Sequence, residues 1–182
     1  MSGVLVTGFE PFGGSDVNTS QQIVEALGGV VLPVSYARAA DALREAVVAA
    51  DPDVVICFGQ ADRDVISVER FALNLDGSES EDNDGVVSTA VIDPDGPVAY
   101  RSTLPVDEIV AALRAEDVPV EASRTAGGFL CNHVFYVLMR LLEGRSGTTG
   151  GFVHVPEEMP LDVLVRAGRV IVATCAAPVS TR

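Results

Sequence analysis

The strongest constraint on the fold is an alternation between two apolar patterns along the chain. Short, continuous apolar segments typical of buried strands are followed by stretches in which apolar residues recur at helical spacing. Helical bundles and β-sandwiches do not produce this alternation, whereas domains with helices packed on a sheet do. The sequence therefore predicts an α/β fold.

The same pattern gives bounds for each element. Strands are expected at residues 4–7, 30–34, 54–58, 66–75, 118–123 and 151–155, and helices at 20–27, 37–50, 106–115, 131–143 and 161–175. In the segment 66–75, Phe71, Leu73 and Leu75 alternate with polar or small residues, so we expect a half-buried strand with these three facing the core. The polar segment 76–97 predicts a long, mobile loop that acts as a lid or specificity loop.

Composition bounds the domain count and the kinds of partner. A chain of 182 residues fits a single domain spanning 1–182, and 48% hydrophobic residues suffice for a core. The chain has 12 basic residues, all of them arginine, and 26 acidic residues. The resulting net charge of −14 disfavours nucleic acid and membrane surfaces as partners. The longest uncharged run, residues 125–139, is shorter than the roughly 20 apolar residues of a membrane helix.

Cysteine and histidine usage indicates a reduced protein without a metal. The three cysteines stand at wide spacing and the N-terminal residues do not resemble a secretory signal, so we expect a cytoplasmic protein. His133 and His154 are the only histidines, and neither belongs to a ligand-spaced cluster. The glycines of GFEPFGG match no nucleotide-binding motif, so we expect neither metal nor cofactor.

Three residues have the chemistry of a catalytic triad. Cys131 stands at the start of a predicted helix, where the helix dipole favours a thiolate, and His154 stands at the end of a predicted strand. Glu69 lies within a strand segment, where carboxylates are uncommon. Each has a simpler interpretation: a core cysteine, a structural histidine, and a carboxylate that pairs with Arg70 or faces solvent. Together they form a Cys-His-acid set, although spacing alone does not show that they meet.

Several motifs, taken in order, resemble the pyroglutamyl-peptidase I family of cysteine peptidases, also called pyrrolidone-carboxylate peptidases. The matching segments are VTGFEPFGGSDVN, FGQADR, VERFALNL, EDNDG, SRTAGGFLCNHVFY and GGFVHVP. The resemblance implies a three-layer α/β/α sandwich with a mostly parallel, twisted sheet. It also implies an omega peptidase that hydrolyses N-terminal pyroglutamate from peptides without a cofactor. Self-association into a dimer or tetramer is implied by the resemblance alone.

The resemblance assigns roles to individual residues. Cys131 is the nucleophile, His154 the general base and Glu69 the residue that orients the imidazole. Pyroglutamate is a neutral lactam, so its pocket should be mostly apolar with a few polar groups. The expected substrate-binding residues are Phe9, Phe12, Asn18, Gln60, Ser80, Phe129 and Leu130.

One departure from the family pattern leaves alternatives open. Where the family commonly has a basic and then an apolar residue shortly before its Asp-Asn pair, this chain has Glu79, Ser80 and Glu81. One alternative is a weak or inactive relative that binds pyroglutamate-like ligands without turnover. Another is an amidohydrolase for a different blocked N-terminal acyl group, because Ser80 would make the pocket more polar.

Overall fold

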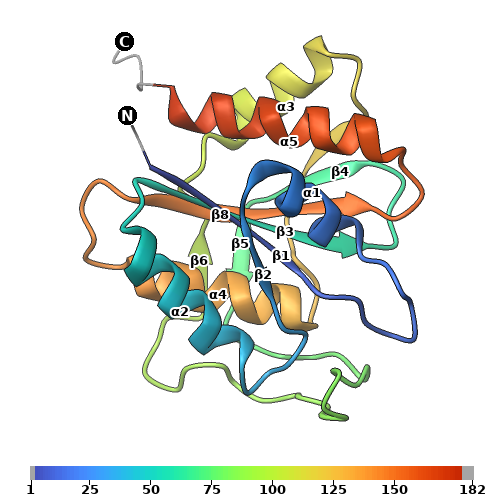
Figure 1. The fold of residues 1–182 in the computed structure, drawn as a ribbon. Coiled ribbons are helices and arrows are strands. Elements are labelled where there is room, and N and C mark those ends of the chain that lie inside the picture. The colour runs from blue at the N-terminus through green and yellow to red at the C-terminus, as the bar shows by residue number, and fades with distance from the viewer. Residues whose placement is uncertain (1–2, 178–182) are drawn as a thin grey trace.

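The computed structural model describes residues 3–177, which form a layered fold around a six-stranded sheet (Figure 1). Its strands, in spatial order, are β2 (Val30–Leu32), β1 (Val4–Phe9), β3 (Val54–Ala61), β8 (Thr149–Pro156), β4 (Ile66–Glu69) and β7 (Val120–Ser123). The first four run parallel, β4 is antiparallel to β8, and β7 is parallel to β4. The sheet is therefore mixed but mostly parallel.

Helices cover both faces of this sheet. One face carries α1 (Thr19–Leu27), α3 (Val106–Ala115) and α5 (Leu161–Ala176), and the other carries α2 (Ala39–Ala50) and α4 (Leu130–Leu142) (Figure 1). A separate cluster of buried apolar side chains fills the space between the sheet and each helix layer. The predicted three-layer sandwich is confirmed. Within residues 3–177, no helix combines the length and apolarity needed to cross a membrane.

The central strands β3 and β8 supply side chains to both clusters. Cys57 and Phe152 join the cluster under α2 and α4, whereas Ile56 and Val153 join the cluster under α1, α3 and α5. All four side chains are fully buried. Strands buried on both faces need apolar residues at every position, which explains the continuous apolar runs in the sequence.

The prediction of a single strand over residues 66–75 is wrong. The chain leaves the main sheet after Glu69, and β5 (Phe71–Leu73) pairs with β6 (Ala99–Arg101), which was not predicted, in a separate two-stranded sheet. Its orientation is also reversed: Ala72 is fully buried, whereas Phe71 and Leu73 are 37% and 38% exposed. The amide group of Asn132 on α4 bonds the backbone N–H and C=O of Leu73, so the backbone and the small Ala72 pack on the helix.

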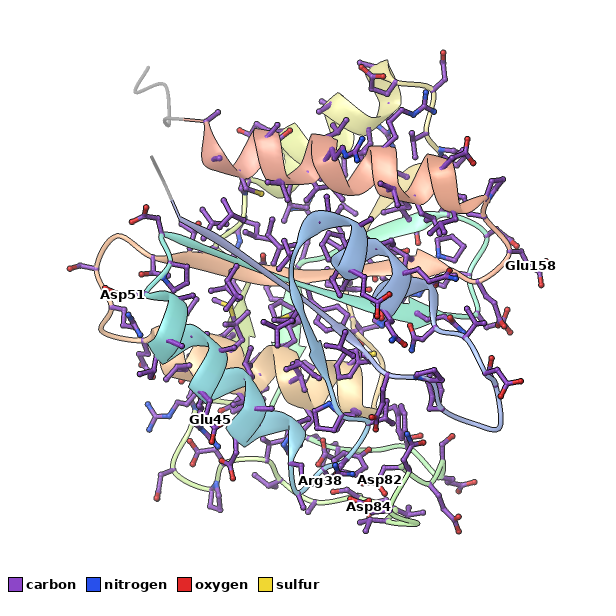
Figure 2. All side chains as sticks on the ribbon, viewed as in Figure 1. Arg38, Glu45, Asp51, Asp82, Asp84 and Glu158 are labelled. Carbon is purple, nitrogen blue, oxygen red and sulfur yellow. The ribbon has the colours of Figure 1, made fainter. Side chains whose placement is uncertain are left out.

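The segment 74–98 is irregular, as was expected for residues 76–97, but carboxylates attach it to the rest of the chain. Asp82 is 6% exposed and accepts hydrogen bonds from the backbone N–H groups of Tyr36, Asp84 and Val86. Asp84 forms an ion pair with Arg38 at 2.9 Å. Figure 2 shows Arg38, Asp82 and Asp84 together near the start of α2. The mobility of this segment and its action as a lid stay predictions.

Candidate active site

Cys131 lies in the first turn of α4, directly above a glycine of the sheet. The helix begins after Phe129, whose extended backbone provides the N-cap without a side-chain bond. A Cβ atom added to Gly59 of β3 would lie 2.8 Å from the Cys131 Sγ and 2.7 Å from the Phe152 ring. Only a residue without a side chain fits there. Strand β3 was expected to end at residue 58, but it continues to Ala61.

The register of the sheet places His154 beside this thiol. Gly59 and His154 are direct partners across the parallel β3–β8 pair, so they occupy neighbouring positions on the same face of the sheet. His154 Nδ1 lies 2.8 Å from Glu69 Oε1, and both side chains are buried. A carboxylate only accepts hydrogen bonds, so Nδ1 carries the proton and Nε2 is left as the basic nitrogen. The structure therefore brings together Cys131, His154 and Glu69.

The electrostatics of the site keep the thiol and the imidazole neutral. Burial, together with the negative charge of Glu69, raises the pKa of Cys131 to about 12, while Arg63 acts in the opposite direction. Burial also lowers the pKa of His154 below its ordinary value of 6.5, although Glu69 opposes this shift. Burial thus opposes the thiolate that the position at the start of a helix was expected to favour. A thiolate forms only when a base removes the proton.

A small apolar cavity opens next to Cys131. Its volume is about 30 Å³, and it is lined by Phe9, Phe12, Asn18, Val34, Gln60, Phe129, Leu130 and Cys131. The rings of Phe12 and Phe129 pack with their centroids 6.0 Å apart. This volume holds about one water molecule.

Two amide side chains line this cavity with different roles. Gln60 Oε1 accepts hydrogen bonds from the N–H and the hydroxyl of Thr19. Its Nε2 has no hydrogen-bond partner among residues 3–177 and is free to donate to a ligand. In contrast, Asn18 caps α1 through Ser20 and donates to the Glu10 carbonyl. Asn18 therefore shapes the wall of the cavity, and its polar atoms are already used.

Ser80 does not lie with the other predicted pocket residues. It is exposed in the segment 74–98, as are Glu79 and Glu81, and it does not line the cavity. The unusual Glu79-Ser80-Glu81 sequence therefore lies outside the cavity wall in this structure. Its position gives no reason for a more polar pocket.

Three residues of the site were missed by the sequence analysis. Val34 lines the cavity, Gly59 makes room for the thiol, and Arg63 bonds Glu69. An isolated glycine within an apolar run is a known sign of close backbone approach, and this sign identifies Gly59. Nothing in the sequence pattern singles out Arg63, because its pairing depends on how the chain turns between β3 and β4.

The chain is similar to one group of known proteins over most of its length. A family model described as pyroglutamyl peptidase matches residues 2–170. The pyrrolidone-carboxylate peptidase of Clavibacter michiganensis is 46% identical over 169 residues, covering 86% of this chain and 79% of the relative. That of Streptomyces coelicolor is 44% identical over 177 residues, covering 88% and 82%. Pyroglutamyl peptidase I of Bacillus amyloliquefaciens matches in structure with a TM-score of 0.93 at 35% identity, covering 97% of this chain and 96% of that one.

Proposed function

Because the chain belongs to the pyroglutamyl peptidase family of cysteine-type hydrolases, we propose that Cys131, His154 and Glu69 are its catalytic residues. The protein removes N-terminal pyroglutamate from peptides. One observation supports the assignment above all others: the Cys131 Sγ lies over Gly59, whose partner in the sheet is His154, and Glu69 bonds that histidine.

The proposed first step forms an acyl-enzyme. His154 Nε2 takes the proton from Sγ as the sulfur attacks the carbonyl carbon of the pyroglutamyl residue. The carbonyl oxygen becomes an oxyanion, which accepts a hydrogen bond from the Cys131 backbone N–H at the start of α4. Because the free thiol and imidazole are neutral, charge separation develops only on the way to the transition state.

The next steps release both products. The imidazolium of His154 donates its proton to the leaving amine as the C–N bond breaks, and Glu69 stabilises the positive charge through Nδ1. A water molecule then attacks the thioester, with Nε2 again accepting a proton. The thiolate leaves and recovers that proton, so free pyroglutamate and the neutral thiol are restored.

The proposed pocket recognises a neutral ring. Five apolar side chains, Phe9, Phe12, Val34, Phe129 and Leu130, surround the cavity, and none of its lining residues carries a formal charge when Cys131 is protonated. In this proposal the Gln60 Nε2 group donates a hydrogen bond to the lactam carbonyl. An unmodified N-terminal residue carries an ammonium group, which would lose its hydration here without a counter-charge.

We also propose that the protein acts in the cytoplasm as a homo-oligomer, a dimer or a tetramer. Cys57, Cys131 and Cys175 are unpaired thiols, which suits a reducing compartment. Leu73, Leu75, Val91 and Val98 line a shallow apolar cavity of about 400 Å³, which suits contact with a second copy. Sedimentation of the wild type and of Val98→Glu tests this assembly; a wild-type protein that stays monomeric at micromolar concentration contradicts it.

The catalytic assignment is tested with two chromogenic anilides. Wild type and Cys175→Ala should release the amine from pyroglutamyl anilide, whereas Cys131→Ala should be inactive. Cys175 is a matched control because it is also a half-buried thiol but packs in the opposite helix layer. Turnover by Cys131→Ala would contradict the assignment, and faster cleavage of prolyl anilide would contradict the lactam pocket. Binding of pyroglutamate by a folded, inactive wild type would favour a binding protein.

A further inference from the structure

We infer that Arg63 is a positioning residue that joins the catalytic carboxylate to the loop leading into the helix that carries the nucleophile. This inference rests on the proposed roles of Cys131, His154 and Glu69. The Arg63 side chain is 25% exposed, and its Nη1 lies 3.0 Å from Glu69 Oε1. Its Nη2 donates a hydrogen bond of 3.2 Å to the Thr125 carbonyl.

The two oxygens of Glu69 differ in their partners. Oε1 accepts both the His154 Nδ1–H bond and the Arg63 contact, whereas Oε2 is buried without a partner among the described residues. The carboxylate therefore depends on one oxygen for all its interactions. A fully buried carboxylate is costly unless a cation compensates it. Arg63 supplies that cation on the same oxygen that orients the catalytic imidazole.

The loop before α4 is the other segment that Arg63 contacts. Thr125 follows β7 and precedes Gly127, whose φ of +80° lets the chain turn towards the nucleophile. The loop is exposed at Thr125, so few side chains hold it from outside. Because one guanidinium donates a hydrogen bond to this loop and forms an ion pair with Glu69, Arg63 links the loop before the nucleophile to the carboxylate that orients the base. Lysine would keep the charge but not this double contact.

The charged surroundings decide the direction of the pH effect. Arg63 lines a cavity with Asp62, Asp64, Glu157 and Glu158, and the groups of the catalytic site beside it are Glu69, His154 and Cys131. The positive charge of Arg63 lowers the pKa of both His154 and Cys131. Without it, His154 becomes protonated at a higher pH. The acid limb of kcat/KM should then move to higher pH.

The test compares Arg63→Ala, Arg63→Lys and the control Arg44→Ala on pyroglutamyl anilide. Arg44 forms a surface ion pair with Asp41, with side-chain exposures of 49% and 72%. For Arg63→Ala we expect kcat to fall about 10- to 100-fold, the range typical of residues that orient a catalytic ligand, with little change in KM. Arg63→Lys should recover part of kcat. Millimolar methylguanidinium should restore activity to Arg63→Ala and leave Arg44→Ala unchanged.

Three results would overturn the inference. The first is a kcat for Arg63→Ala within about twofold of wild type, and the second is a rise in its KM at unchanged kcat. The third is a fall in kcat that neither the Arg63→Lys substitution nor methylguanidinium reverses, although the protein is folded. Circular dichroism measures folding in each sample. If Arg63→Ala does not fold, the inference is judged on the kcat of Arg63→Lys and on the pH of its acid limb. An inactive wild type would instead contradict the proposed function, so the two failures are distinguishable.

Discussion

Two histidines in this protein each bond a buried carboxylate, but only one of them belongs to the proposed catalytic site. His154 Nδ1 lies 2.8 Å from Glu69, and His133 Nδ1 lies 3.0 Å from Asp76. Both pairs are largely removed from solvent, with exposures of 4% and 0% for the first pair and 14% and 3% for the second. By pair geometry and burial alone, both resemble part of a catalytic triad.

The difference lies in what surrounds each imidazole. His154 stands on a strand beside Gly59 and the Cys131 thiol. His133 stands on α4 against the edge of the Tyr36 ring, at a centroid distance of 5.4 Å. Its partner Asp76 also accepts a hydrogen bond from Ser88.

We therefore interpret the second pair as an attachment between α4 and the segment 74–98, and the first as a base. A histidine–carboxylate pair becomes catalytic only when a nucleophile lies within reach of the other ring nitrogen.

Replacing each histidine gives the largest contrast. His154→Gln removes the basic nitrogen, so kcat should fall about 1,000-fold or more. His133→Gln should keep kcat within about tenfold of wild type, because this ring contacts no reacting atom. Steady-state kinetics on pyroglutamyl anilide measures both variants. The comparison fails if the two variants lose similar activity while both remain folded.

Replacing the two carboxylates isolates what each partner contributes. Glu69→Gln removes the charge that fixes the Nδ1–H tautomer and stabilises the imidazolium, so kcat should fall about 100-fold or more. Asp76→Asn should mainly cost stability, about 1 kcal/mol in the free energy of unfolding, because a charged hydrogen bond becomes a neutral one. Kinetics and urea unfolding of both variants separate these effects. A larger kcat loss in Asp76→Asn than in Glu69→Gln would reverse the assignment.

The space beside His154 gives a third, smaller test. Gly59→Ala places a methyl group 2.8 Å from the Cys131 Sγ, so the thiol must shift away from the base. We expect about tenfold lower kcat and a loss of about 1–3 kcal/mol in stability from overpacking. Gly77→Ala is the matched control, because a Cβ there meets no atom within 4 Å. Unchanged kcat in Gly59→Ala would mean that the thiol does not need this position.

The regular parts of the fold were predictable from the sequence. Helix α3 has the expected bounds of 106–115, because its apolar residues follow helical spacing closely. The triad residues follow from their motifs, and register then explains why Gly59 and His154 are neighbours.

The failures come from contacts between distant segments. The Asn132 side chain redirects residues 71–75 by bonding their backbone, and Arg63 reaches Glu69 across the turn before β4. Local periodicity contains no information about such tertiary bonds, because it reports only which face of one element is apolar.

The smallest expected effect is the pH dependence that His154 gives to stability and activity. The pKa of His154 in the folded protein is below its ordinary value of 6.5. At a pH between the folded pKa and 6.5, the unfolded chain therefore binds a proton that the folded chain does not. Above about pH 6.5 this histidine costs no stability; as pH falls towards its folded pKa, stability declines and the neutral base is lost. Urea unfolding from pH 7.5 to 5 should show this decline in wild type and in His133→Gln, and a smaller one in His154→Gln. Equal declines in all three proteins would mean that the buried imidazole is not the group that resists protonation, and the acid limb of kcat/KM would then need another origin.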